Sequence, residues 1–353
     1  MSIEETTPPA TVGELPPEFT ALMRLGDLAT PMAVRVAANL RLVDHIHDGA
    51  HDLESLSKAS AANRDSLRRL IRHLIAINVL SEPTPDYYEP TEIGKLLASD
   101  HPVTQLGWLD PAHMIGRADL ALVDLFDAVR DGRAVYKQRY GKDFWEDVSD
   151  DQVLGDTFYD LMAHGQLRIF KEVVEQGEWD GVRHILDVGG ADGDLISALL
   201  SREPGIRATL LELPGPAARA RTKLARAGQV DRFDVVDGSF FEPLPVTADL
   251  ITLSFVLHNW SDEDAVRILH RCVDALEPGG SILLIECAEQ SHSTPDPGFT
   301  SGDLRMMVYF EGRERTYDEW VKLADAAGLE ITSVSDAYAY GARVLKLVRR
   351  SSQ

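Results

Sequence analysis

The chain has 353 residues, which is enough for a large α/β domain and a second domain beside it. Its 57 acidic and 35 basic residues give a formal net charge of -22, so we expect it to bind neither nucleic acid nor an anionic membrane. The two cysteines, Cys272 and Cys287, offer no disulfide framework and no zinc-type spacing, and no His, Asp and Glu cluster has metal-ligand spacing. We therefore expect a cytoplasmic protein without a metal site.

Residues 1–17 are polar, acidic and rich in proline. They have neither the basic start nor the apolar centre of a secretion signal. No later run approaches the ~20 apolar residues that a membrane-spanning helix needs. We expect a mobile tail over 1–17 and no segment that crosses a membrane.

The region 18–100 is expected to be a mainly helical domain. From about Pro31, apolar side chains recur at three- and four-residue steps, which predicts one amphipathic helix over 32–47. Its stripe consists of Met32, Val36, Leu40, Val43, Ile46 and His47. Two short helices are expected over 53–77, around the turn at 61–63, and the segment DYYEPTEIGKLLASD predicts a short strand and another helix. The expected arrangement is a helix-turn-helix with a wing.

A winged helix-turn-helix can bind DNA, and four arginines would give its second helix a basic face. They are Arg64, Arg68, Arg69 and Arg72. Their spacing is that of the solvated side of one amphipathic helix, and the whole chain is strongly acidic. A DNA-binding sensor of small molecules is therefore an alternative that the net charge disfavours.

Residues 101–180 are expected to add further helices, with loops around Pro111, Gly132 and Gly141. Over 181–353 the pattern changes, because short strand-like runs alternate with helical stretches. These runs are HILDV, ATLLEL, FDVVDG, ADLITLSFVL and GSILLIECA. The alternation predicts an α/β domain with a parallel, Rossmann-like sheet that helices cover on both faces.

The first of these strands runs into a glycine-rich turn, DVGGADGD. Gly189, Gly190 and Gly193 would let the backbone approach a ligand at the carboxyl end of the strand. The spacing is neither the dinucleotide pattern G-x-G-x-x-G nor a phosphate loop, and Asp187 and Asp192 would repel a pyrophosphate. The acids instead favour a ligand with a positive centre, such as S-adenosylmethionine.

Polar residues also end the next two strands. Glu212 could accept hydrogen bonds from both hydroxyls of a ribose, and Ser239 with Phe240 could bond and cover an adenine. Each residue alone could equally be a strand end or a packed turn. Because the glycine turn, the acid and the Ser-Phe pair follow successive strands, together they predict one nucleoside site.

His258 follows the fourth strand in the stretch SFVLHNWSDED. The acids after it are explained by the start of a helix, with Ser261 as the N-cap and residues 262–264 favoured by the helix dipole. That explanation does not account for His258 or Trp260. A satisfied histidine at a strand end is the plain alternative to a functional one.

The motifs together resemble those of the class I S-adenosylmethionine-dependent small-molecule O-methyltransferases, from about Glu18 to Arg349. They are DVGGADG, LLELP, DGSFFEPLP, LSFVLHNWSDEDAVRIL, ALEPGGSILLIE and GRERTYDEW. The branch that tailors bacterial anthracyclines is similar in RLGDLATPMAVRVAANLRLVDHI, LRRLIRHL, RYGKDFWEDV and DLRMMVYFEGRERT. The resemblance implies a winged-helix-like dimerisation domain, a homodimer, and S-adenosylmethionine as the cofactor.

The resemblance also implies which residues hold the cofactor. Gly189 would contact its methionyl end, and Glu212 with Leu213 would contact its ribose. Ser239 with Phe240 would contact its adenine, and Ser254 would lie near its carboxylate. Two positions depart from the family pattern. Ala191 stands where a glycine is usual, and Ser239 replaces an adenine-binding aspartate, which would weaken that contact.

By the same resemblance, His258 lies beside the transferred methyl group, and Glu286 and Glu314 match two acids that flank it. A phenolate is a better nucleophile than a phenol, and an imidazole with a pKa near 6.5 is suited to accept the phenolic proton near neutrality. In the anthracycline branch this position is often apolar and catalysis relies on proximity. His258 therefore favours methylation over the hydroxylating or decarboxylating activities of some relatives.

The acceptor contacts follow from the resemblance as well. Asn259 and Arg305 match positions that line the acceptor pocket of similar proteins. Phe158, Met162 and Met306 are candidate walls for a flat aromatic, although such residues at helical spacing are more often core. The expected acceptor is a planar polyketide phenol with an anthraquinone or anthracycline-like ring system. An enzyme that hydroxylates or decarboxylates such a substrate, with the cofactor in a structural role, is the alternative.

Overall fold

The computed structural model describes residues 16–177, 179–228, 231–290 and 294–350. The chain divides into two compact units, one ending at Asp110 and the other beginning at Pro111. Nearly all of the tail expected over 1–17 lies outside the described residues. Pro17 already starts a helix, α1 (Pro17–Leu25), which the sequence pattern did not predict.

The first unit is helical and contains one two-stranded hairpin. After α1 come α2 (Ala29–Asn39), α3 (Leu42–His47), α4 (Leu53–Ser60), α5 (Arg64–Ala76), β1 (Leu80–Thr84), β2 (Tyr87–Pro90), the 3-10 helix η1 (Gly94–Leu97) and α6 (Leu106–Leu109). The predicted helix-turn-helix is confirmed: Ala61 ends α4 with a left-handed φ of 54°, and the Asn63 side chain caps α5. Antiparallel β1 and β2 form the wing, and the four arginines lie on the exposed face of α5.

The single helix predicted over 32–47 is wrong. Arg41 has a left-handed φ of 52°, which separates α2 from α3. The break also divides the apolar stripe, because Val43 and Ile46 are buried in the core of the first unit whereas Met32 and Val36 stay exposed. The 3.6-residue pattern could not reveal this break, since the residues on both sides of Arg41 keep helical spacing.

The second unit begins with short helices and one long helix. These are α7 (Met114–Asp119), the 3-10 helix η2 (Leu120–Asp124), α8 (Leu125–Asp131), α9 (Tyr136–Tyr140), α10 (Phe144–Asp150) and α11 (Gln152–Gln176). Gly132 and Gly141 end α8 and α9 with φ values of 64° and 80°, a backbone conformation that glycine adopts without strain. Both glycines were predicted to lie in loops, and they do.

The rest of the second unit is built on an eight-stranded sheet. Its strands are β3 (His184–Val188), β4 (Arg207–Glu212), β5 (Phe233–Asp237), β6 (Ala248–Ser254), β7 (Leu276–Glu289), β8 (Arg315–Thr316), β9 (Leu329–Val334) and β10 (Ala342–Arg349). The order is β5-β4-β3-β6-β7-β10-β9, with β8 beside β7. The five predicted strands, β3 to β7, pair in parallel. β10 runs antiparallel to β7 and β9, so the sheet is mixed and the expectation of a wholly parallel sheet is corrected.

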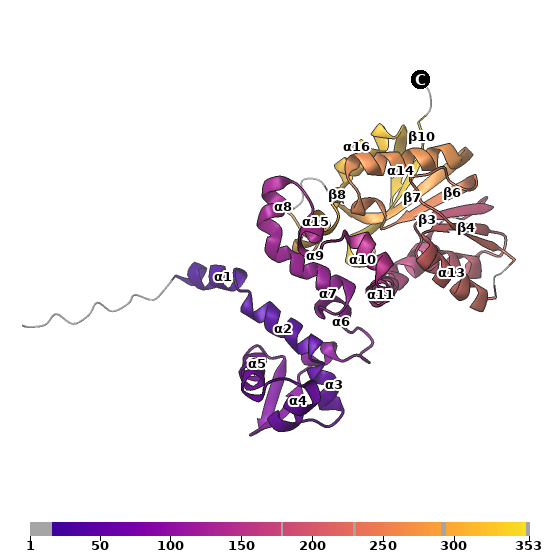
Figure 1. Ribbon diagram of the computed structural model, residues 1–353. Helices are drawn as coiled ribbons and strands as arrows, with labels where there is room; N and C mark the ends of the chain where they lie inside the picture. Colours follow the sequence, from indigo (N-terminus) through magenta and orange to yellow (C-terminus); the bar gives the residue numbers. More distant parts are fainter. Residues whose placement is uncertain (1–15, 178, 229–230, 291–293, 351–353) are drawn as a thin grey trace, which may run out of the picture. The chain divides into compact units, whose positions relative to one another are not determined.

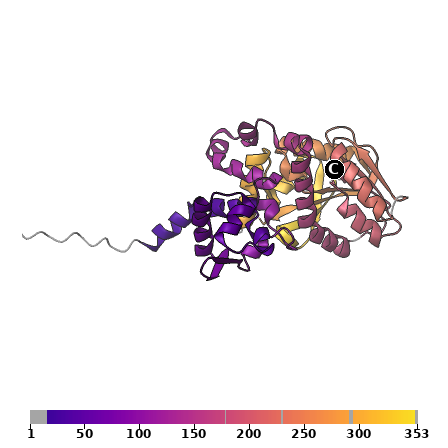
Figure 2. The same ribbon diagram turned by 60° about the horizontal axis from the view of Figure 1, so that its bottom comes forward.

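Helices cover both faces of this sheet, as predicted. α14 (Asp262–Ala275) and α16 (Tyr317–Ala326) pack on one face, and α12 (Asp194–Arg202), α13 (Pro214–Arg226) and the end of α11 pack on the other (Figure 1). Figure 2 shows the same layers turned by 60°. The chain goes from β3 outward to β5 and then returns to β6, so β3 and β6 meet at the point where the strand order reverses. Ligands of open α/β sheets bind at the carboxyl ends of strands at such a point.

A search of the helices in the described ranges finds none that is long and apolar enough to cross a membrane.

Candidate active site

The glycine turn after β3 passes so close to its neighbours that side chains are excluded. A Cβ at Gly189, where φ is +73°, would lie 2.9 Å from Cγ2 of Val256 and 3.6 Å from the ring of Phe240. A Cβ at Gly190 would lie 2.1 Å from Oδ2 of Asp187. The backbone of the turn therefore passes close to the residues that follow β5 and β6, and its approach to a ligand stays a prediction.

The carboxylate of Asp187 lies beneath this turn. It is fully buried, and its Oδ1 accepts a hydrogen bond of 2.6 Å from the hydroxyl of Thr252 on β6. Its Oδ2 has no hydrogen-bond partner within the described chain. Burial raises the pKa of Asp187 to about 6, because a low dielectric disfavours the charged form. Asp187 therefore leaves no room for a side chain at Gly190.

The other acids of the turn are already paired. Lys223 of α13 lies 3.0 Å from Asp192 and 2.5 Å from Asp194. The expectation that Asp192 would attract a positive ligand is therefore weakened, since its charge is compensated from within the protein. Gly193, with φ of +82°, opens α12 directly below this ion pair.

Glu212 ends β4, as predicted, and faces the glycine turn. Its two carboxylate oxygens accept hydrogen bonds from the backbone N–H groups of Ala191, at 3.0 Å, and of Leu213, at 2.7 Å. A carboxylate has about four acceptor positions, so two remain for the hydroxyls of a ribose. Burial, opposed by these two hydrogen bonds, raises the pKa of Glu212 to about 7. Leu213, next in the chain, is exposed.

Ser239 and Phe240 follow β5 at the same edge of the sheet. The ring of Phe240 lies next to Gly189 and makes an edge contact of 5.7 Å between centroids with Trp260. The Ser239 hydroxyl accepts a hydrogen bond from the backbone N–H of Phe241. Phe240 thus gives the turn an aromatic wall, and Trp260, which sequence reasoning left unassigned, supports that wall.

Ser254 is the last residue of β6. It is buried, and its hydroxyl has no hydrogen-bond partner among the described residues. An unpaired buried hydroxyl is costly unless a ligand or water satisfies it. Together with the close-packed glycines and the open acceptor positions of Glu212, Ser254 fits a nucleoside ligand with a polar amino-acid end, as S-adenosylmethionine has.

The strand that carries His258 ends earlier than predicted. The apolar run ADLITLSFVL suggested a strand up to residue 257, but β6 stops at Ser254 because Phe255 takes a left-handed φ of 54°. The chain then forms a 3-10 turn, η3 (Leu257–Asn259), which presents His258 beyond the strand end. Glu286 of β7 fixes this turn, since its Oε1 accepts the N–H groups of Val256, at 3.1 Å, and Leu257, at 2.8 Å.

Both predicted acids lie beside His258. Its Nδ1 is 3.0 Å from Oε1 of Glu314 and 3.9 Å from Oε2 of Glu286. The shorter contact is a hydrogen bond, which favours the proton on Nδ1 and leaves Nε2 as the nitrogen that could accept another proton. Glu314 therefore orients the imidazole, whereas Glu286 mainly holds the turn that bears it.

The electrostatics differ from the expectation of an ordinary histidine. Burial acts to lower the pKa of His258, but the charges of Glu314 and Glu286 outweigh it and raise that pKa to about 9. Burial in turn raises the pKa of Glu286 to about 7. The prediction of a pKa near 6.5 is therefore wrong, because it could not include two carboxylates that come from distant parts of the chain.

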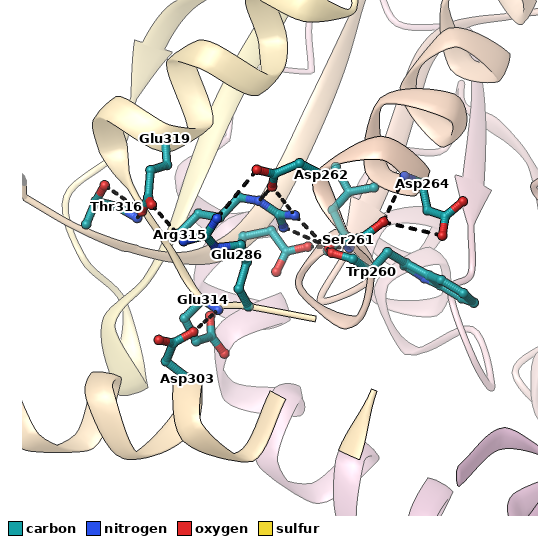
Figure 3. A network of polar contacts seen from close by, with 12 residues as sticks. Trp260, Ser261, Asp262, Asp264, Glu286, Asp303, Glu314, Arg315, Thr316 and Glu319 are labelled. Carbon is teal, nitrogen blue, oxygen red and sulfur yellow. Dashed lines mark hydrogen bonds and ion pairs between the residues drawn. The ribbon is translucent and has the colours of Figure 1, made fainter. Parts of the chain in front are cut away.

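Two residues that sequence reasoning missed, Arg315 and Asp303, hold this arrangement together, and Figure 3 shows both with their partners. The buried guanidinium of Arg315 donates to the carbonyl oxygens of Leu257 and Trp260 and to the carboxylate of Asp262. Asp303 of α15 (Pro297–Tyr309) accepts the backbone N–H of Glu314 at 2.9 Å. Arg315 lies within the motif GRERT, so the motif contained the signal, but nothing in the sequence showed what the arginine contacts.

The predicted acceptor contacts from α15 lie close to Glu314. A Cβ at Gly302 would lie 3.7 Å from Cγ of Glu314, and Met306 is one helical turn further along the same side. Arg305 is not free, because its guanidinium forms a two-point ion pair with buried Asp119 of α7, with 2.8 Å between Nε and Oδ1. The side-chain amide of Asn259 donates to the carbonyl of Phe255 at 3.3 Å.

The remaining predicted wall residues come from α11. Phe158 makes edge contacts with Phe144 and Trp145, at centroid distances of 5.5 and 5.7 Å. Phe158, Met162 and Met306 all lie half-buried at the margin of one apolar cluster, built from α7 to α11 and α15. All three therefore pack against the same cluster, as core residues also would.

No group of three or more His, Cys, Asp and Glu side chains in the described part of the chain could hold a metal ion.

Comparisons with known proteins identify the family of this chain. The model of the O-methyltransferase domain matches residues 122–330, and the model of the O-methyltransferase dimerisation domain matches residues 23–100. The chain belongs to the S-adenosylmethionine-dependent O-methyltransferases. The predicted family, its cofactor and its class I fold with a helical N-terminal dimerisation domain are thereby confirmed.

Individual relatives come from aromatic polyketide pathways. Aclacinomycin 10-hydroxylase RdmB of Streptomyces purpurascens is 48% identical over 88% of this chain and 84% of its own length. The 2,7-dihydroxy-5-methyl-1-naphthoate 7-O-methyltransferase of Streptomyces carzinostaticus is 42% identical over 88% of this chain and 92% of its own. One similar solved structure is that of the O-methyltransferase NcsB1 from neocarzinostatin biosynthesis, in complex with S-adenosylmethionine and 2-hydroxy-5-methyl naphthoic acid. The match has a TM-score of 0.87 and 40% sequence identity, and it covers 93% of this chain and 98% of that chain.

Proposed function

We propose that this O-methyltransferase methylates a phenolic hydroxyl of a planar aromatic polyketide, with His258 as the general base. The observation that carries the proposal is the 3.0 Å contact between Nδ1 of His258 and Glu314, in the turn that follows the carboxyl end of β6. Relatives named for naphthoate O-methylation support the acceptor class.

Some residues of the site would bind the cofactor, and His258 would transfer a proton. Glu212, Ser239 with Phe240, and Ser254 would hold the nucleoside and the amino-acid end of the cofactor. When bound, S-adenosylmethionine supplies an electrophilic methyl group on its sulfonium centre. His258 Nε2 would accept the phenolic proton, and the imidazolium so formed is stabilised by its hydrogen bond to Glu314.

The walls of the acceptor pocket would be apolar and flat. Phe158, Met162 and Met306 form the margin of an aromatic-rich cluster, which suits a fused ring system. Asn259 and the ion-paired Arg305 would be the polar residues that line the pocket. An anthraquinone or anthracycline-like ring remains the proposed acceptor, alongside the hydroxynaphthoic acids of the relatives.

A second activity is favoured by one specific observation, the 48% identity to a relative named as a hydroxylase. In that alternative the chain would insert one atom of molecular oxygen into its substrate and use the cofactor structurally, while two electrons from an added reductant convert the other oxygen atom to water. His258 with its two acids supports methylation, because a phenol must lose its proton for its oxygen to attack the methyl group.

The experiment that separates the two activities measures products directly. The protein is incubated with S-adenosylmethionine carrying an isotopically labelled methyl group and a panel of hydroxynaphthoic acids, hydroxyanthraquinones and anthracyclines. Formation of S-adenosylhomocysteine in equal amount to a labelled methyl ether supports the proposal. A product one oxygen atom heavier, without S-adenosylhomocysteine, would replace it with the hydroxylase.

We also propose that the protein acts as a homodimer formed through the dimerisation domain, and that it works in the cytoplasm. The matched dimerisation model over residues 23–100 supports the first. Both cysteines are free thiols, which supports the second.

A further inference from the structure

Arg315 is the largest polar side chain that is completely buried in the described chain, with 0% of it exposed. Its Nη1 donates to the carbonyl of Leu257 and its Nη2 to the carbonyl of Trp260, both at 2.9 Å. Its Nε and Nη2 donate to Asp262, at 2.9 and 2.8 Å. The two carbonyls lie on either side of His258 and Asn259, so one guanidinium spans the turn that presents the histidine. Figure 3 shows Arg315 beside Trp260 and Asp262.

The same turn is held from its other side by Glu286. The carboxylate of Glu286 binds the N–H groups of Val256 and Leu257, whereas Arg315 binds carbonyls of the turn. The backbone N–H of Arg313 also donates to the carbonyl of His258 at 2.9 Å. The position of the imidazole is therefore set by β7 and by the segment around β8, rather than by β6 alone.

We propose that Arg315 is a positioning residue for His258, which fixes the turn that carries the imidazole and supplies a buried positive charge that limits how tightly Glu286 and Glu314 hold its proton. The inference rests on the proposed function, in which His258 is the general base. It assigns a task to a residue that need not touch cofactor or acceptor.

The charges around the imidazole come from four elements. Glu286 of β7 and Glu314, which precedes β8, raise the pKa of His258, and the charge of Arg315 acts in the opposite direction. Behind them lie Asp303 of α15, which binds the backbone of Glu314, and Asp262 at the start of α14, which pairs with Arg315. Cys287 of β7 has a pKa that burial, Glu314 and Glu286 raise, so it stays neutral.

Only arginine satisfies this position. Three contacts in different directions require a planar fork with several donors, which the single ammonium of lysine does not provide. Lysine would keep the positive charge but lose some of the hydrogen bonds to the turn. Methionine would fill a similar volume and lose both the charge and the hydrogen bonds. The two substitutions therefore separate positioning from charge.

The test is a titration of His258 in the full-length protein. Histidine is labelled with nitrogen-15, and the signal of His258 is assigned by its loss in His258→Gln. In Arg315→Met, the pKa of His258 should rise by roughly one unit, because a neighbouring positive charge has been removed. In Asp262→Asn it should fall by about a few tenths, since that carboxylate is exposed and its charge is screened by solvent. In Arg315→Lys it should stay within about 0.3 unit while kcat falls about tenfold with little change in KM.

The matched control is Arg232→Lys, because Arg232, like Arg315, donates to backbone carbonyls, here those of Leu200, Glu203 and Ile206, far along the chain from His258. It should change thermal stability without moving the pKa of His258 or the ratio of kcat to KM. An unmoved His258 pKa in Arg315→Met, or shifts of equal sign in Arg315→Met and Asp262→Asn, would overturn the proposal. If Arg315→Met does not fold, the other two variants decide. The proposal is overturned if Arg315→Lys leaves kcat unchanged, or if Asp262→Asn does not lower the pKa of His258.

The titration also separates this inference from the proposed function. If no phenol in the panel is methylated but the shifts appear as expected, the link between Arg315 and His258 holds and the assigned reaction is wrong. If methylation occurs and the shifts are absent, the reaction is right and Arg315 is only a packing residue.

Discussion

At the scale of single residues, the surroundings of His258 set the pH range in which it can work. With a pKa of about 9, roughly one imidazole in a hundred is neutral at pH 7. The neutral form is a stronger base than an ordinary histidine, but it is scarce. Since only that form can accept a phenolic proton, kcat/KM should increase with pH up to about 9, above the range that an unperturbed histidine would give.

Replacing His258 tests this directly. His258→Ala should lower the single-turnover rate of methyl transfer ~10²- to 10⁴-fold, the usual span for a general base, and leave cofactor affinity nearly unchanged. The loss should shrink as the pH approaches the pKa of the acceptor phenol, because the substrate then ionises without help. A phenol next to a quinone carbonyl is internally hydrogen-bonded and should depend on His258 most strongly.

The measurement is a pair of pH–rate profiles from pH 6 to 10 for the wild type and His258→Ala. The wild-type limb should bend near pH 9. A deficit of only a few fold that does not vary with pH would show that His258 shapes the pocket and that proximity alone carries the reaction.

Glu212 carries a second prediction at this scale, because its pKa is raised to about 7. Only the ionised carboxyl accepts hydrogen bonds from both ribose hydroxyls, so affinity for S-adenosylhomocysteine should fall as the pH drops through 7, roughly tenfold between pH 8 and pH 6. Glu212→Ala should weaken binding by ~1.5–3 kcal/mol at pH 8, and Glu212→Gln should remove the pH dependence. Calorimetry with equal affinity for all three proteins would exclude Glu212 from the site.

At the scale of elements, the sequence was most informative where a strand gives way to a polar residue. The turn at Gly189, the acid at Glu212 and the histidine after β6 all follow parallel strands, and the carboxyl ends of such strands meet at one edge. Local pattern and global topology therefore point to the same place. That agreement is why the location of the cofactor site could be predicted, whereas the contact of each residue with the cofactor stays a prediction.

Contacts made across the fold could not be predicted in this way. The end of β6 at Ser254 depends on a left-handed Phe255 and on Glu286, which lies 30 positions beyond Val256. Likewise, tertiary packing sets the antiparallel pairing of β10 with β7 and β9. The alternation of side chains along a strand is the same whichever way the strand runs, so it does not predict this direction. Sequence patterns carry no information on such partners, so the pKa of His258 and the task of Arg315 emerged only from the structure.

The glycine turn offers a prediction for this element. Gly190→Ala places a Cβ 2.1 Å from Oδ2 of buried Asp187, so the turn or the carboxylate must move. We expect a lower melting temperature and no measurable binding of S-adenosylhomocysteine. Gly215→Ala in α13 is the control, because its Cβ would meet no atom within 4 Å and alanine favours a helix. Thermal-shift measurements in which both variants respond to the ligand as the wild type does would show that the turn tolerates a side chain.

At the scale of the whole molecule, α1 is the feature that a single chain leaves unexplained. It has no buried residue, and it exposes four large apolar side chains, Phe19, Leu22, Met23 and Leu25. Water contact with such a surface is unfavourable, and exposed apolar patches in soluble proteins usually mark an interface. The dimerisation model begins within this helix, at residue 23, so a second copy of the chain is the partner that fits.

We therefore expect a homodimer whose interface includes α1 and buries roughly 2,000 Å² or more in total. Multi-angle light scattering at micromolar concentration should give twice the mass of one chain. The double substitution Leu22→Glu with Leu25→Glu should shift the protein toward the monomer, because two charges would have to be buried without partners. Val153→Glu is the matched control, since Val153 is a similarly exposed apolar residue on α11. A monomeric wild type would refute the dimer, and a double variant that stays as firmly dimeric as the control would place the interface elsewhere on the chain.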